Sequence, residues 1–111
     1  MRKELWEVND IIMDIIVHSG EAKSYAMEAM QRAKLDDIKT ARVLIEKSIV
    51  KLERAHVLQS TLIQDEASKG KIELSILLIH AQDQLMNSML LKDLANEFID
   101  LYEKLKENNI T

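Results

Sequence analysis

The sequence predicts an all-α protein, an antiparallel bundle of three long helices in a single domain spanning residues 1–111. The first observation is composition, because the chain contains no Pro and only two Gly, and strand-rich domains need these residues at their turns. The second is periodicity, because apolar residues recur mainly at spacings of three and four, as on one side of a helix. A length of 111 residues is typical of one domain.

The first helix is expected from about Lys3 to Lys34. Its apolar face is formed by Leu5, Val8, Ile12, Ile15, Ile16, Ala22, Ala26, Ala29 and Ala33. Gly20 lies inside this helix, where it costs about 1 kcal/mol relative to Ala. Because Ser19 and Ala22 next to it are also small, Gly20 indicates a close approach of another helix in preference to a functional hinge.

The second helix is expected over residues 38–66, after a break at KLDDIK in which Asp36 or Asp37 is a good N-cap. The break at ASKGK follows it, and Gly70 there is free to take a left-handed conformation. One side of this helix is formed by Ala41, Ile45, Ile49, Leu52, His56, Gln59 and Ile63.

The third helix is expected over residues 72–107. It carries a heptad seam of Ile72, Ile76, Ile79, Asp83, Met86 and Leu90. A second stripe consists of Leu77, Gln84, Asn87, Leu91, Leu94, Phe98, Leu101 and Leu105. A lone bundle of three such helices would be thin, so one stripe is expected to pack within the subunit and the other against copies of the chain. A homo-oligomer is therefore favoured over a monomer.

Asp83 occupies a core position of the seam. An ionised carboxylate buried there would cost several kcal/mol, and facing its own copies would make the repulsion worse. A divalent cation such as Mg²⁺ on the symmetry axis would resolve the conflict, since hard cations prefer carboxylate oxygens. Equally open is a helix rotated so that Asp83 simply faces solvent.

His80 lies one turn before Asp83, beside the seam. A lone His near an apolar stripe is more often structural than catalytic. Asp83, however, lies three residues on, where it would orient the ring or balance its charge, and a neutral imidazole with a pKa near 6.5 is nucleophilic. Because the chain has no Cys, His80 is its best candidate for a covalent nucleophile.

The other two histidines support weaker hypotheses. Glu53 and His56 form a Glu-x-x-His pair, but a carboxylate-bridged di-metal bundle needs two such pairs and two further Glu residues, so this site is disfavoured. His56 and Gln59 share an apolar face and are expected to form a buried hydrogen-bonded pair. His18 has no local ligand and is expected to be structural.

Charge and hydropathy exclude other classes. A net charge of −4, without any cluster of Lys or Arg, argues against a nucleic-acid partner. No apolar run approaches the ~18 residues of a membrane span, and MRKELWEVND lacks the apolar core of a signal peptide. A cytoplasmic protein without membrane insertion is expected.

Four blocks of sequence resemble the sugar-specific IIA components of the bacterial phosphoenolpyruvate phosphotransferase system, lactose/cellobiose family. HAQDQLM at 80–86 resembles the family's His-x-Gln-Asp-His-Leu-Met motif. SGEAKSYAMEAM at 19–30, AHVLQSTLIQDEASKGK at 55–71 and LLKDLANEFIDLYEKLK at 90–106 resemble further segments. The blocks occur in the family's order and spacing and cover nearly the whole chain.

The resemblance implies a phosphotransferase component of three-helix subunits in a nine-helix homotrimer. His80 would accept a phosphoryl group from HPr and pass it to a cysteine of the IIB component. The sugar, a β-linked disaccharide of the cellobiose, chitobiose or lactose type, is carried by the membrane component IIC. Asp83 would bind one structural divalent metal ion, Mg²⁺, per trimer on the threefold axis. HAQD in place of HGQD favours the cellobiose or chitobiose type over lactose.

The sequence departs from the family at three positions. Gln84 replaces the second motif histidine and cannot carry a proton, while Ser60 and Lys23 replace the usual Thr and Arg. The sequence leaves open whether Gln82, Gln84 or His56 contacts the phosphoryl group. The alternative function, from a different class of protein, is a non-catalytic helical scaffold or regulatory adaptor that uses the same oligomer seam.

Overall fold

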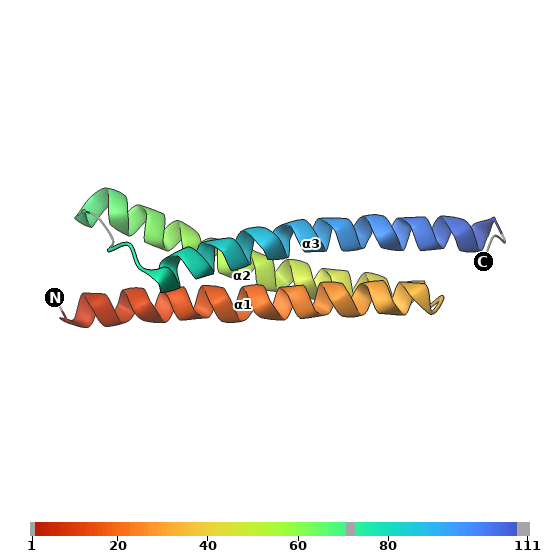
Figure 1. The fold of residues 1–111 in the computed structure, drawn as a ribbon, viewed down its shortest axis with the longest axis horizontal. Coiled ribbons are helices and arrows are strands. Elements are labelled where there is room, and N and C mark those ends of the chain that lie inside the picture. The colour runs from red at the N-terminus through yellow and green to blue at the C-terminus, as the bar shows by residue number, and fades with distance from the viewer. Residues whose placement is uncertain (1, 71–72, 109–111) are drawn as a thin grey trace.

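The computed structural model describes residues 2–70 and 73–108, and all regular structure within them is helical. Helices α1 (Arg2–Lys34), α2 (Ile38–Lys69) and α3 (Ile76–Glu107) run alternately in opposite directions along a bundle of 62 × 20 × 17 Å (Figure 1). The prediction of an all-α, antiparallel three-helix subunit is confirmed. Within the described ranges, no helix has a stretch long and apolar enough to cross a bilayer.

The turn between α1 and α2 uses the two aspartates differently. Asp36 takes a positive φ of 71°, which closes the turn. Asp37 is the N-cap of α2, and its side chain accepts a hydrogen bond of 3.2 Å from the backbone N–H of Thr40. This hydrogen bond lowers the pKa of Asp37, because it stabilises the ionised carboxylate.

The connection between α2 and α3 differs from the prediction. Helix α2 continues to Lys69, and Gly70 then takes a φ of 100°, a region open to glycine. Helix α3 begins at Ile76 and not at residue 72, which lies outside the described residues. The reason is Ser75, which stays extended and accepts a hydrogen bond of 3.1 Å from the N–H of Leu78 as N-cap.

The interior of the bundle is lined largely by small side chains. The apolar face predicted for α1 is confirmed for every described side chain in it, each being buried or half-buried. The buried small residues of the three helices are Ala22, Ala26, Ala29, Ala33, Ala41, Ala55, Ala81, Ala95, Ser19, Ser48 and Ser88. Such residues let helix backbones approach closely. The hydroxyls of Ser88 and Ser48 donate hydrogen bonds of 2.8 Å to the carbonyls of Ser19 and Ala22 on α1.

The face predicted for α2 is correct only in its first half. Ala41, Ile45, Ile49 and Leu52 are buried or half-buried, and Gln59 is half-buried. His56 and Ile63, however, are exposed, and Ala55 and Leu62 are buried in their place. Ala55 gives a weak hydrophobic signal, so its place on the inward face was missed and the stripe was continued through the wrong residues.

The inward face of α3 is neither of the two predicted stripes. It consists of Leu78, Ala81, Leu85, Ser88, Leu91, Ala95, Ile99 and Tyr102, of which only Leu91 belongs to a predicted stripe. The described seam residues Ile76, Ile79, Asp83, Met86 and Leu90 are all exposed, and so are Leu94, Phe98 and Leu101 of the second stripe. Gln84, Leu91 and Leu105 of the second stripe are half-buried, so the expectation that one whole stripe packs within the subunit is wrong. The face that packs also uses Ala and Ser, which give little hydrophobic signal.

Candidate histidine site on α3

His80 lies in the second turn of α3 with its side chain exposed. Its neighbour Ala81 is buried against the bundle, so the ring projects away from the core. The ring forms no hydrogen bond or ion pair with any described residue. An imidazole that is accessible and has no partner within the subunit can be reached by other proteins.

The helix surface that precedes His80 is apolar. Ile76 and Leu77 precede it by four and three residues, the spacings that make helical neighbours, and both are exposed. Ile79, adjacent in sequence, is exposed as well. These residues form an apolar collar (Ile76, Leu77 and Ile79) that a docking partner would cover.

Asp83 is exposed and lies one turn after His80. Ile79, Met86 and Leu90 share its outward face and are exposed with it. The single subunit agrees both with a seam between copies and with a carboxylate that simply faces solvent. The exposed apolar residues on either side of Asp83 form a surface that copies of the chain would cover. In the single subunit this carboxylate is open to solvent, and its burial among copies stays a prediction.

The metal site predicted at Asp83 is not complete within one chain. Among the described residues, no three His, Asp or Glu side chains are grouped so that they would hold a metal ion. Copies of Asp83 brought together by the seam would supply several carboxylate oxygens, a donor set that suits Mg²⁺. The residues fit the ion only in an assembly.

The two glutamines near His80 face different partners. Gln82 accepts a hydrogen bond from the side-chain amide of Gln59 on α2. Gln84 lies against α1, where its amide nitrogen is 3.4 Å from the position that a Cβ on Gly20 would occupy. At Gly20 itself, α3 makes contact only through the end of this side chain, so the close helix approach predicted there is not observed. The helices approach closely one residue earlier, where the hydroxyl of Ser88 donates a hydrogen bond to the carbonyl of Ser19.

The buried pair of His56 and Gln59 predicted on α2 is wrong. His56 is exposed, while Gln59 turns toward α3 and bonds Gln82. The side of α2 on which His56 lies does not pack in this bundle, because Ala55 takes the inward position beside it.

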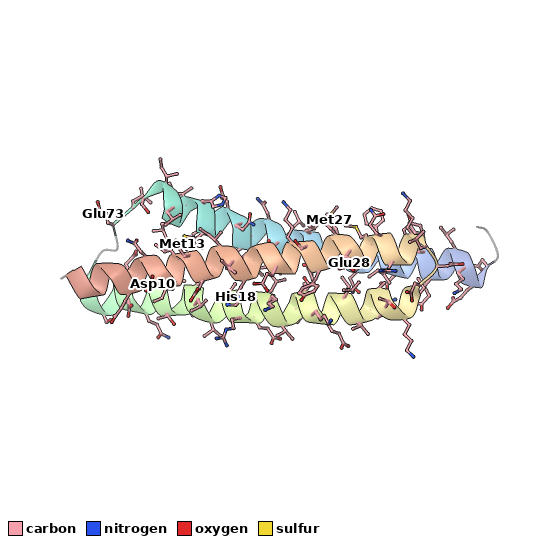
Figure 2. All side chains as sticks on the ribbon, turned by 90° about the horizontal axis from the view of Figure 1, so that it is seen from below. Asp10, Met13, His18, Met27, Glu28 and Glu73 are labelled. Atoms are coloured by element: carbon pink, nitrogen blue, oxygen red, sulfur yellow. The ribbon has the colours of Figure 1, made fainter. Side chains whose placement is uncertain are left out.

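His18 lines a cleft that its sequence did not indicate. It lies on the side of α1 that faces α2 (Figure 2). There it lines a cleft of about 480 Å³ together with Asp14, Val50, Glu53, Arg54, Val57 and Leu58. The Nδ1 atom of His18 is buried without a hydrogen-bond partner among the described residues. Nearby, the ion pair of 2.8 Å with Lys51 lowers the pKa of Glu21.

The fold and the site define a helical protein whose candidate reactive group stands on the surface of its last helix, within an apolar collar. The family follows from comparison with known proteins. The model of the family "PTS system, Lactose/Cellobiose specific IIA subunit" matches residues 10–103. The chain belongs to this family and is a component of a sugar phosphotransferase system, as its motifs predicted.

Relatives from three systems resemble the chain over most of its length. The lichenan-specific phosphotransferase enzyme IIA component of Bacillus subtilis (strain 168) is 46% identical over 101 residues, which cover 91% of this chain and 92% of the relative. The crystal structure of the cellobiose-specific enzyme IIA from Bacillus anthracis has a TM-score of 0.87 and 47% identity, covering 90% of this chain and 92% of that one. The IIA(Chitobiose) component of Escherichia coli, solved in solution in complex with HPr, has a TM-score of 0.79 and 40% identity, covering 89% and 96%.

Proposed function

We propose that this protein is a phosphocarrier that accepts a phosphoryl group from the phosphohistidine of HPr on His80. It passes the group to a cysteine of the cognate IIB component. The observation that carries the proposal is the exposed imidazole of His80, which no described residue engages. A second support is the structural similarity to the IIA(Chitobiose) component that was solved with HPr bound.

The two transfers need positioning and charge compensation more than covalent help from the protein. In the first, a ring nitrogen of neutral His80 attacks the phosphorus, the donor's N–P bond breaks, and its electron pair stays on the donor imidazole. In the second, the IIB thiolate attacks, an S–P bond forms, and the electron pair of the broken N–P bond returns to His80. The collar of Ile76, Leu77 and Ile79 excludes water when a partner docks, which protects the labile N–P bond.

Three copies of the chain pack through the seam on α3 in the working protein. The support is the large apolar surface of the seam, with Ile76 88% exposed and Met86 62% exposed in the single subunit. One Mg²⁺ ion held by three copies of Asp83 offsets the repulsion between carboxylates that the threefold contact would otherwise create.

The sugar is a β-linked disaccharide of the cellobiose or chitobiose type. The chain does not touch it, since phosphoryl transfer reaches the sugar through IIB at the membrane component IIC. The proposal is supported by the HAQD sequence at residues 80–83 and by relatives whose names refer to cellobiose, chitobiose and lichenan. A carrier that exchanges phosphoryl groups with HPr and IIB acts in the cytoplasm.

The test of the carrier role is phosphorylation in a reconstituted system. Wild-type protein incubated with phosphoenolpyruvate, enzyme I and HPr should gain one phosphoryl group per subunit by mass spectrometry. His80→Ala should gain none while keeping its helicity by circular dichroism. His56→Ala, which removes an exposed imidazole from α2, is the matched control and should label fully. Labelled His80→Ala would exclude His80, and unlabelled wild type would favour a scaffold or adaptor.

The metal proposal is tested separately by sedimentation. Wild-type protein should sediment as a trimer that a chelator weakens, because removing the ion leaves three carboxylates facing one another. Asp83→Leu should give a trimer that no longer responds to the chelator. Wild-type protein that is monomeric both with and without divalent metal would contradict the axial ion.

A further inference from the structure

The two glutamines of the HAQDQ segment lie on different sides of α3. Gln84 follows His80 by four residues, a spacing that places two side chains one above the other on a helix. Helical side chains also lean toward the N-terminus of their helix. The side chain of Gln84 therefore covers the turn to which His80 belongs. Gln82 is turned by about 200° from His80, given 3.6 residues per turn, and its amide is engaged by Gln59 on α2.

The amide of Gln84 is positioned but not satisfied. The side chain is half-buried, and its amide nitrogen lies over Gly20, at an ordinary contact distance of 3.4 Å from the place of the missing Cβ. A residue with a longer side chain at this point of α1 would occupy the space of the amide. Gln84 forms no hydrogen bond with any described residue. A half-buried amide without a partner retains donors for a ligand.

We propose that the side-chain amide of Gln84 donates a hydrogen bond to an oxygen of the phosphoryl group on His80. Gln84 thereby acts as a catalytic residue of the transfer. This inference rests on the proposed function and assigns one of its charge-compensating groups. In the transfer, negative charge is spread over three equatorial oxygens, and a fixed donor aimed at one of them stabilises that charge. A neutral amide supplies the hydrogen bond without giving up or taking a proton.

The test compares two glutamines that differ in their partners. Gln84→Met keeps the length and packing of the side chain but removes its donors. The rate of phosphoryl transfer from phospho-HPr should fall about 10- to 100-fold, the effect of one hydrogen bond to a charged group. Gln82→Met is the matched control, because it breaks the bond to Gln59 without facing His80, and its rate should stay within about twofold of wild type.

A merely structural role for Gln84 would give a different kinetic pattern. The loss in Gln84→Met should appear in kcat with KM for phospho-HPr nearly unchanged, because the hydrogen bond goes to the moving group and not to the docking surface. Gln84→His, which restores an N–H donor, should recover most of the rate. A Gln84→Met rate within twofold of wild type, a loss confined to KM, or a Gln84→His protein as slow as Gln84→Met would each overturn the assignment.

A measurement on the wild-type protein tests the same hydrogen bond without depending on whether the variants fold. In ¹⁵N-labelled wild type, phosphorylation should shift the side-chain NH₂ resonances of Gln84 and leave those of Gln82 in place. Unshifted Gln84 resonances in a phosphorylated protein would overturn the inference while the carrier function stands. If wild-type protein does not label at all, the proposed function itself fails.

Discussion

The two faces of α3 differ in the sizes of their side chains. The inward face contains Ala81, Ser88 and Ala95, all with essentially no exposure, and it is the face that packs on α1 and α2. The outward face carries Ile76, Leu90 and other large apolar side chains that stay exposed. The inward face therefore combines small residues with a few large ones such as Leu85 and Ile99, whereas the outward face is formed mainly by large ones.

The difference shows that burial in the subunit and apolar size serve separate purposes here. Close packing of three helix backbones needs small side chains at the contacts, while the free energy of association needs large apolar area. An exposed apolar face of this kind marks an interaction surface. The outward face of α3 also carries Asp83, and His80 with its collar lies at its edge, so the proposed assembly and the proposed chemistry share one side of one helix.

The largest effect on folding is expected where the inward face does carry a large residue. Leu85 is 1% exposed and packs in the core cluster with Ile12 and Ile15. Leu85→Ala should lower the free energy of unfolding by about 2 to 5 kcal/mol, through lost burial and the cavity left behind. Urea denaturation followed by circular dichroism measures this. A loss below about 1 kcal/mol would mean that the inward face of α3 has been wrongly placed.

The outward face should respond in assembly and not in helical structure. Leu90 is 59% exposed in the subunit, so Leu90→Glu should leave the helicity intact but place three carboxylates in the proposed trimer contact. Sedimentation velocity should then show loss of the trimer. Val50→Glu is the control, since Val50 is 61% exposed on α2. A Leu90→Glu protein that still sediments as wild type would remove the seam from the interface.

The smallest effect is expected at the contact of α1 with α3 below Gln84. Gly20→Ala should raise the free energy of unfolding by about 0.5 to 1 kcal/mol, because Ala is the better residue inside a helix. The added Cβ meets only the end of the Gln84 side chain, at 3.4 Å, which is ordinary contact. Thermal melting measures the gain. A clear loss of stability would show that α1 and α3 approach more closely at Gly20 than the fold indicates.

The part of the candidate site that depends on local sequence motifs could be predicted. His80 and Asp83 were identified from HAQD and from the seam, and their exposure on one helix agrees with that interpretation. The roles of Gln82 and Gln84 were left open, because both are amides within a turn and only the neighbouring helices distinguish them. Gln59 of α2 engages the first, and Gly20 of α1 makes room for the second.

The sequence by itself determined the three helices, the cap at Asp37 or its neighbour, and the family. These depend on local propensity, on spacing and on motifs that need no knowledge of packing. Only the tertiary structure decided which face of α3 turns inward, where α2 departs from its predicted stripe, and that Ser75 delays the start of α3. The physical reason is that Ala and Ser make the closest helix contacts while contributing little hydrophobic signal, so the faces that pack best are the least conspicuous in the sequence.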